Sequence, residues 1–247
     1  NVALGYDTLS TDTLGSRSTA IGYEALYTQN FTTATQTLNT AVGFEAGTAI
    51  TTGVQNTLIG SSAGDAMTDA DHNVAVGLNS LGTNVLGSKS TAVGTGALAT
   101  QNPATAINMY NVAVGYDAGV SVTTGQSNTL IGSLAGDALT TPASNTAVGQ
   151  NALGADTQGS NTTAIGAGAL QSQNFTTATE SYNTAVGTYA GASVTTGQYN
   201  TLIGRASGDA ITVGNSNTAV GQNALGADTK GDLNTAIGIG ALQSQNF

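Results

Sequence analysis

Hydrophobic and polar residues alternate in a five-residue motif that recurs along the whole chain. The motif Asn39-Thr40-Ala41-Val42-Gly43 occurs in variant forms fourteen times, and its fourth position is always Val, Ile or Leu. Alternation of this kind, with Thr and β-branched residues, is typical of a short β-strand. Each motif ends on a glycine, at Gly5, Gly22, Gly43, Gly60, Gly77, Gly94, Gly115, Gly132, Gly149, Gly166, Gly187, Gly204, Gly221 and Gly238.

The spacing of these glycines is regular. Successive intervals are 17, 21, 17 and 17 residues and then repeat, so a 72-residue super-repeat covers 1–72, 73–144, 145–216 and, in part, 217–247. Units this short have no room for paired helices, and stacks of short units form solenoids. We therefore predict an all-β parallel β-solenoid of about 14 coils, with residues 1–247 as a single repetitive domain. The four coils of a super-repeat are called first, second, third and fourth, and positions are counted from the start of each motif.

The two sides of each strand carry different residues. Positions two and four lie on one side, and positions three and five lie on the other. Because exposed rows of Val and Ile are costly, we predict that positions two and four face the interior of the coil. The Ala/Gly side then faces outward and suits close approach by another chain. The candidate oligomer-interface residues are Ala41, Gly43, Ala147, Gly149, Ala164, Gly166, Ala185 and Gly187. The alternative is that glycine only permits a turn after the strand.

A second pattern concerns the large apolar residue of each coil. Position nine is Leu in every first and second coil and Gly in every third and fourth coil. Position twelve does the reverse, being polar in the first two coils and apolar in the other two. Leu153 with Asp156, and Gly191 with Val194, illustrate the two arrangements. A closely packed core with room for one large apolar residue per coil explains why that residue stands either at position nine or at position twelve. We therefore predict that both positions face the interior of the coil.

The second coils carry four additional residues. These lengthen the segments 27–38, 99–110 and 171–182, which we expect to bulge as loops, one in every fourth coil. They carry the largest side chains that we expect near the surface. The candidate surface-contact residues are Phe31, Tyr110, Phe175 and Tyr182.

Asparagine opens eleven of the fourteen motifs. If the coils stack at strand spacing, these amides lie above one another and form a hydrogen-bonded ladder along the axis. The alternative is that Asn serves only as a turn residue that tolerates left-handed backbone geometry.

Composition narrows the classes of function. Only 7% of the 247 residues are charged and 5% are aromatic, there is no Cys or Trp, and 34 residues are Gly. Fourteen acidic against four basic residues give a net charge of −10, so no basic stripe is present to bind nucleic acid. No apolar run is long enough to span a membrane, so membrane insertion is not expected. The lack of cysteine identifies no redox compartment.

Residues that commonly carry chemistry are few and scattered. The single histidine, His72, stands in an acidic turn at 69–72 that has no counterpart in the other coils. Asp65, Asp137 and Asp209 recur every fourth coil, which places them about 19 Å apart at about 4.8 Å per strand. Glycosidase carboxylate pairs need a separation of about 5 to 10 Å. We therefore predict no enzyme, no catalytic residue, no cofactor and no metal site.

The words Asn-Thr-Ala-Val-Gly and Asn-Thr-Ala-Ile-Gly, followed by x-x-Ala-Leu, resemble the head repeats of YadA-type trimeric autotransporter adhesins. They are equally similar to repeats in the fibre and tail-spike proteins of bacteriophages and large viruses. The resemblance covers the whole chain and implies a left-handed parallel β-roll, three chains about one axis, and a role in surface attachment. Adhesin heads usually have shorter units, which favours the phage or viral fibre.

These features lead to one main functional hypothesis and two alternatives. We expect the structural shaft of an extracellular or virion fibre, a homotrimer whose loops or further domains contact a cell-surface glycan or protein receptor. A bacterial trimeric surface adhesin head is one alternative. An ice-binding or carbohydrate-binding solenoid is another, motivated by Thr at position two in eleven coils. Ice-binding faces expose Thr outward in flat ranks, whereas these Thr share a side with the Val and Ile assigned to the interior. The expected location is extracellular, on a cell surface or on a virion.

Both ends of the chain resemble its middle. The chain begins on a motif, and its last three residues, Gln245-Asn246-Phe247, repeat those at 173–175. A free-standing solenoid needs atypical capping units to protect its open edges, and neither end carries one. We therefore expect the chain to be a window of a longer array.

Overall fold

The chain is an all-β parallel β-solenoid, as the repeat predicts. The computed structural model describes residues 1–245, which contain short strands and turns and no helix. Asn246 and Phe247, from the repeated terminal tripeptide, lie outside the described residues. The chain divides into two compact units, Asn1–Gln126 and Ser127–Phe247.

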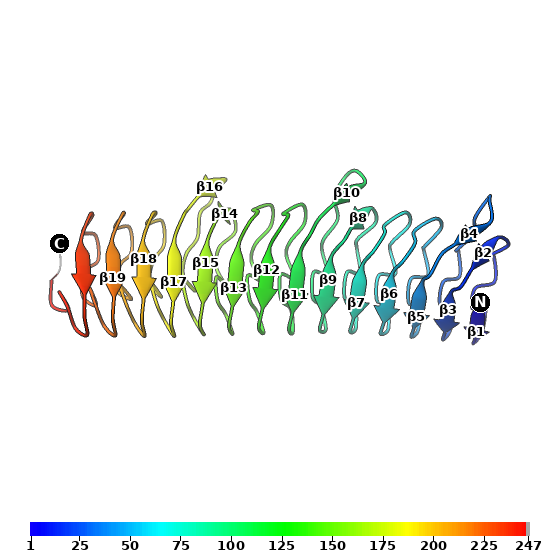
Figure 1. Ribbon diagram of the computed structural model, residues 1–247, viewed down its shortest axis with the longest axis horizontal. Helices are drawn as coiled ribbons and strands as arrows, with labels where there is room; N and C mark the ends of the chain where they lie inside the picture. The colour runs from blue at the N-terminus through cyan, green and yellow to red at the C-terminus, as the bar shows by residue number, and fades with distance from the viewer. Residues whose placement is uncertain (246–247) are drawn as a thin grey trace. The chain divides into compact units, whose positions relative to one another are not determined.

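The first unit contains seven main strands, one from each coil, paired in parallel in chain order (Figure 1). Equivalent motif positions face one another across the sheet, so that Ala41 pairs with Ala20 on one side and with Leu58 on the other. The strands are β1 (Val2–Leu4), β3 (Thr19–Ile21), β5 (Thr40–Val42), β6 (Thr57–Ile59), β7 (Val74–Val76), β9 (Thr91–Val93) and β11 (Val112–Val114).

The second unit repeats this arrangement with seven further strands in its described part. Ala147 pairs with Leu130 and with Ala164, again at equivalent positions. The strands are β12 (Thr129–Ile131), β13 (Thr146–Val148), β15 (Thr163–Ile165), β17 (Thr184–Val186), β18 (Thr201–Ile203), β19 (Thr218–Val220) and β20 (Thr235–Ile237).

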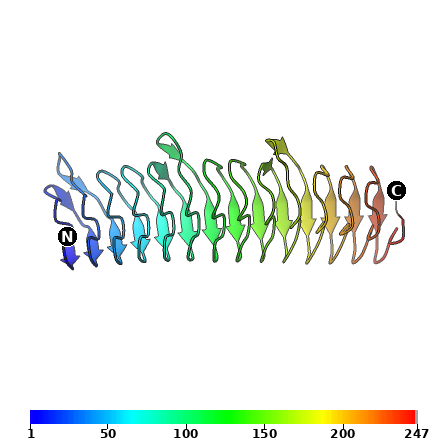
Figure 2. The same ribbon diagram turned by 180° about the vertical axis from the view of Figure 1, so that it is seen from behind.

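The three lengthened segments leave the stack as loops, as predicted. Each carries a two-residue strand that pairs in parallel with the turn of the preceding first coil. The loops with β10 and β16 extend beyond the neighbouring coils of their own units (Figure 1 and Figure 2). The pairs are β2 (Gly15–Ser16) with β4 (Thr35–Gln36), β8 (Gly87–Ser88) with β10 (Ile107–Asn108), and β14 (Gly159–Ser160) with β16 (Thr179–Glu180).

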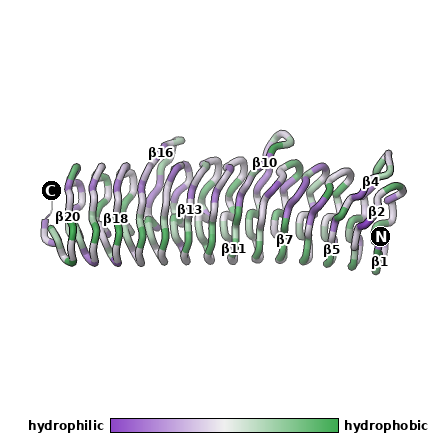
Figure 3. The backbone as a smooth tube through the Cα atoms, in the orientation of Figure 1, coloured by the Kyte–Doolittle hydropathy of each residue, from purple (hydrophilic) through white to green (hydrophobic). Residues whose placement is uncertain are grey.

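The residues alternate across each main strand as predicted, but the two sides are reversed. Position three is buried in every coil except the first, whereas positions two and four are half-buried or exposed. Position three is Ala, or Leu in the fourth coils such as Leu58. The interior beside the strand is narrow because side chains from positions nine and twelve already occupy it. Figure 3 shows hydrophobic positions recurring at equivalent places in successive coils of each unit.

The prediction that positions nine and twelve both face the interior is confirmed. Leu98 and Leu153 at position nine are fully buried, and so are Ile50 and Val194 at position twelve of coils with a glycine at position nine. A Cβ placed on Gly47 would lie 2.6 Å from Leu58 Cδ1 and 3.1 Å from Ile50 Cδ1. Leu58, at position three of the next coil, is therefore a third participant in the exchange.

Left-handed backbone recurs at fixed positions of the coil. Position nine has a positive φ whether the residue is Leu or Gly, with φ of 50° at Leu98 and 59° at Gly119. Position seven and the last residue of each coil share this geometry, for example at Glu45 and Tyr199. The coil therefore depends on several residues in a region that most side chains avoid.

The asparagine ladder is present and uses the backbone as well as the amides. The side-chain oxygen of Asn39 accepts the N–H of Asn56 at 2.9 Å, and Asn56 does the same for Asn73. The Asn39 amide donates to the carbonyl of Gly53 at 2.8 Å. Position-one Asn residues do not have a positive φ, so the alternative of a left-handed turn residue is wrong.

Candidate interaction surface

The alanines predicted to contact another chain do not reach the surface. Their side chains point into the coil and have no exposed area, so the prediction of an outward Ala face is wrong. The physical reason is volume, because in the first three coils of a super-repeat large side chains fill the space beside the strand, and only the fourth coils accept a leucine at position three. The residues are Ala41, Ala147, Ala164 and Ala185.

The glycines of the same prediction pack against the next coil of their own chain. Gly43, Gly149, Gly166 and Gly187 have φ between 130° and 144°, where side chains are strained. A Cβ on Gly149 would lie 2.6 Å from the backbone carbon of Gly166. The alternative, that glycine permits the turn, accounts for this geometry. Contact of these glycines with a second chain stays a prediction.

The face that the strands turn outward carries Thr, Val and Ile. We call positions two and four of the main strands the outer face. Most of these residues are half-buried, and Ile59, Ile131, Ile165 and Ile203 are 38–40% exposed. No coil has a charged residue at either position. In each unit the outer face is thus an uncharged, largely apolar surface with the regular spacing of the strands.

The four candidate surface-contact residues of the inserted loops divide into two pairs. Tyr110 and Tyr182 are 53% and 45% exposed, whereas Phe31 and Phe175 are only 7% and 5% exposed. The expectation that all four lie at the surface is therefore wrong for the phenylalanines. A Cβ on Gly159 would lie 2.9 Å from the Phe175 ring, so the missing side chain of that glycine makes room for the ring.

Three exposed aromatic residues at position six were missed from the sequence. Tyr6, Tyr23 and Phe44 stack with ring centroids 5.3 and 5.2 Å apart and nearly parallel planes. The neighbouring Glu24 carboxylate accepts a hydrogen bond from Tyr23 and raises the pKa of that phenol. Their shared position in three successive coils was the signal that predicts the stack, because equivalent positions lie above one another.

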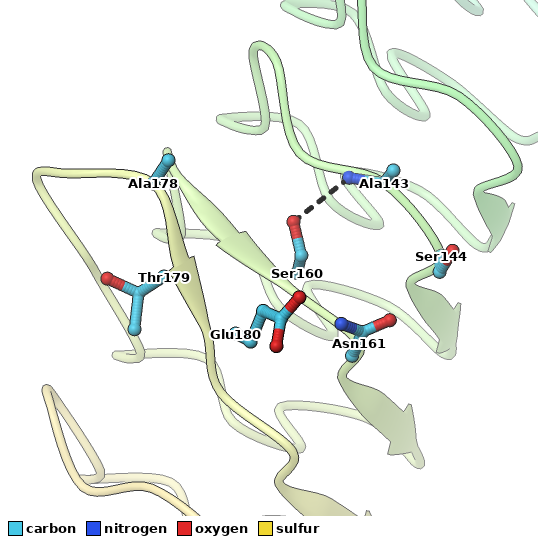
Figure 4. Close-up of a pocket in the computed structure, with 7 residues that line it drawn as sticks. All are labelled: Ala143, Ser144, Ser160, Asn161, Ala178, Thr179 and Glu180. Carbon is cyan, nitrogen blue, oxygen red and sulfur yellow. Dashed lines mark hydrogen bonds between the residues drawn. The ribbon is translucent and has the colours of Figure 1, made fainter.

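A hollow of about 480 Å³ opens beside the inserted loop of the second unit. We call it the β14–β16 hollow; it is lined by Ala143, Ser144, Ser160, Asn161, Ala178, Thr179 and Glu180 (Figure 4). The Ala143 N–H donates to Ser160 Oγ at 3.1 Å and joins two walls. Glu180 is held from outside the hollow, since Tyr182 Oη donates to Glu180 Oε2 at 2.6 Å. This bond raises the pKa of Tyr182.

The corresponding positions beside the first-unit loop at 99–110 carry different charges. Asp71 and His72 stand where the hollow has Ala143 and Ser144, and Lys89 and Asn108 stand where it has Asn161 and Glu180. Lys89 Nζ lies 5.5 Å from the centroid of the Tyr110 ring, a cation–π contact. The inserts at 99–110 and 171–182 thus share a backbone plan and differ in the groups they present.

A buried carboxylate anchors the inserted loop of the second unit. Asp156 Oδ2 accepts the Gln173 amide at 2.6 Å, and Oδ1 accepts the N–H groups of Gly159 and Phe175 at 2.9 and 3.2 Å. Burial nevertheless raises the pKa of Asp156, because these bonds only partly replace the lost hydration. Asp156 lies inside the coil and away from any surface site.

The scattered acidic residues form no metal-binding group in the described part of the chain. Burial raises the pKa values of Asp65 and Asp209, but residues 1–245 contain no group of three His, Cys, Asp or Glu side chains placed to hold a metal ion. His72 is exposed. The described part of the chain also contains no helix long and apolar enough to cross a membrane.

Comparison with known proteins provides no relative. No protein-family model, curated protein or solved structure matches the chain.

Proposed function

We propose that the chain is a structural shaft segment of an extracellular or virion fibre, in which identical chains associate through their outer faces. The observation that carries this proposal is the uninterrupted rank of half-exposed Thr, Val and Ile on the sheet of each unit. Exposed apolar surface of this extent marks an interaction site in a soluble protein. Three chains is the number that the resemblance to trimeric fibres implies.

A second copy of the chain is the partner that this face fits best. The ranks repeat with strand spacing, and an identical chain presents ranks with the same spacing. The chain carries a net charge of −10, yet no charge occurs at positions two and four. Two such faces can therefore meet without placing like charges in contact.

The test is the mass of the assembly by light scattering, for the wild type and for two matched variants. Val148→Asp places an unpaired charge on the outer face and should shift the mass to that of one chain while circular dichroism stays β-rich. Thr196→Asp adds the same charge at an exposed turn of the same unit and should leave the mass unchanged. A wild-type mass of one chain would contradict the proposal.

Ice binding is a second candidate function, because Thr at position two lies on the outer face and not in the interior. This orientation removes the objection raised from the sequence. Thr146, Thr163, Thr184 and Thr201 stand in register on adjacent strands. The candidate requires that the face stay accessible, so it predicts a monomer with measurable thermal hysteresis. Hysteresis that disappears in Thr163→Lys with Thr184→Lys would favour it over the fibre, and its absence from the wild type would exclude it.

A further inference from the structure

The β14–β16 hollow is lined by none of the outer-face residues, so its lining and the proposed contact between chains use different residues. We propose that this hollow binds a neutral saccharide. The proposal goes beyond the fibre shaft and does not depend on it.

The polar groups of the hollow match the hydroxyl groups of a sugar. Asn161 offers an amide that both donates and accepts, Ser144 offers a hydroxyl, and Glu180 offers carboxylate oxygens. Within residues 1–245 the side chains of Ser144 and Asn161 form no hydrogen bond, so their bonding capacity is open to a ligand. Tyr182 holds one Glu180 oxygen and fixes the orientation of the carboxylate. A few oriented polar groups around a concave site are what fixes a small ligand in place.

The charge and size of the hollow disfavour other classes of ligand. Its only charged side chain is Glu180, which repels phosphates and acidic sugars. A single carboxylate is also too few to hold a divalent cation. Calcium, for example, takes six or more oxygen ligands. The two alanines supply only methyl groups, which leaves little surface for an apolar ligand.

An aromatic pair beside the hollow adds the apolar contact that a sugar ring requires. The Tyr182 ring stacks on Tyr199 with centroids 5.4 Å apart, and both rings are about half exposed. Aromatic rings with a polar end suit ligands that are apolar on one side and polar on the other. A pyranose has this character, with C–H groups on its faces and hydroxyl groups on its rim. A sugar of two or more residues is therefore long enough to occupy the hollow and contact Tyr182.

The experiment measures saturation-transfer NMR and dissociation constants for three neutral probes, maltohexaose, cellohexaose and chitohexaose, with hexagalacturonate as the charged comparison. At least one neutral probe should bind the wild type more tightly than hexagalacturonate. Glu180→Ala and Asn161→Gly should each weaken that binding about tenfold, the effect of losing a hydrogen bond to an oriented group. Glycine is chosen for Asn161 because the residue has a φ of 59°, which glycine adopts without strain.

The matched control is Lys89→Gly, which makes the same backbone change at the equivalent left-handed position of the first unit, where φ is 62°. It should leave the dissociation constant within about twofold, which is less than half a kcal/mol. Circular dichroism confirms that each variant remains folded. The proposal is overturned if no neutral probe binds at about 10 mM, a tenfold excess over a millimolar constant. It is also overturned if Lys89→Gly weakens binding as much as Asn161→Gly, or if hexagalacturonate binds more tightly.

Discussion

Leucine at a left-handed position is the least expected choice among the residues of this fold. At position nine, Leu26, Leu98 and Leu153 have φ between 50° and 57° and are fully buried. A left-handed backbone costs a non-glycine residue about 1–2 kcal/mol. Burial of a leucine side chain contributes about 1.5–3 kcal/mol, which offsets that cost. Where another side chain fills the space, as at Gly47, glycine takes the position and the strain disappears.

This balance predicts an inverted order of substitutions at Leu153. Leu153→Ala should destabilise the chain more than Leu153→Gly, by about 1 kcal/mol, because both lose the side chain but only alanine retains the left-handed cost. Leu130 is the control, since it is also fully buried but lies in strand β12 without a positive φ. There the alanine variant should be the more stable one. Urea denaturation measures both pairs, and the same order at both sites would refute the explanation.

The glycine that ends each motif should tolerate no side chain, for reasons internal to one chain. Gly149→Ala places a Cβ 2.6 Å from the backbone of Gly166 at a φ of 132°. We expect a loss of about 3 kcal/mol or more in the free energy of unfolding. Gly226→Ala is the matched control, because its Cβ has no neighbour closer than 3.1 Å and its φ is not positive. It should cost about 1 kcal/mol or less. Equal losses at the two sites would count against the backbone contact.

The strand positions and their spacing were predictable, but the direction of the side chains was not. Period and alternation depend only on the repeat, and both are confirmed. The orientation was argued from residue size, on the assumption that Val42 and Val148 must be inside. The overlooked signal lies at position three, which is Leu only in fourth coils, where position nine is Gly. Two positions that compensate for each other in volume share one space, so Leu58 and Gly64 indicate that position three faces inward.

The inserted loops are elements with a common plan and different anchors. In the second unit, Asp156 holds Gln173 and the backbone of Phe175. In the first unit, Asp12 accepts the Gln29 amide at 3.0 Å beside the loop at 27–38, whereas beside the loop at 99–110 the equivalent residue is Asn84, whose side chain bonds only to the N–H and the carbonyl of Gly87. The Nε2 of Gln101, the counterpart of Gln173, is buried there without a partner. The hollow beside the anchored loop was not predictable from the repeat, because it depends on how far one loop stands from the next turn.

The anchor of the second-unit loop should make stability depend on pH. Because burial raises the pKa of Asp156 in the folded chain, the folded state binds the proton more tightly than the unfolded state, whose Asp pKa is about 3.9. The stability that this tighter proton binding adds to the folded chain is therefore fully present below about pH 4. It is lost as the pH rises through the pKa of folded Asp156. Asp156→Asn removes this dependence, so the variant should gain stability relative to the wild type as the pH rises above about 4.

Thermal melts at several pH values measure this difference. The control is Asp7→Asn at an exposed position, which accounts for the general effect of removing one negative charge. The assignment of the pH dependence to Asp156 would be contradicted if the melting temperatures of Asp156→Asn and the wild type differed by the same amount at every pH. It would also be contradicted if Asp7→Asn showed the same pH-dependent difference.

For the molecule as a whole, the net charge opposes the association between chains that we propose. Fourteen acidic residues against four basic ones give each chain a charge of −10, whereas the outer face is uncharged. Chains that meet through this face therefore repel one another through charges elsewhere on their surfaces. Salt screens that repulsion, with a Debye length of about 30 Å at 0.01 M and about 10 Å at 0.1 M.

Association should accordingly strengthen as salt is added. We expect the dissociation constant of the assembly to decrease when sodium chloride is raised from about 0.01 M to about 0.1 M, because the Debye length becomes much shorter over that range. Sedimentation equilibrium at both concentrations measures the change. Association that weakens with salt would mean that ion pairs, and not the uncharged outer face, hold the chains together.

The interrupted asparagine ladder has a consequence for how a repetitive chain finds its register while it folds. Near-identical repeats invite pairing errors, in which a coil stacks on the wrong neighbour. A slip of one coil preserves every strand pairing but places Ser90 or Thr162 at a position where the ladder requires Asn. It also places a position-nine leucine beside a coil whose neighbour normally has glycine there. Gln29, Gln101 and Gln173 each accept the amide of the following third-coil Asn, and Asp228 likewise accepts that of Asn234, whereas the Ser or Thr that opens the other second coils has no side-chain amide to donate. Only slips of 72 residues or a multiple of 72 restore the order of the four coil types, so shorter slips are penalised from the first mispaired coil.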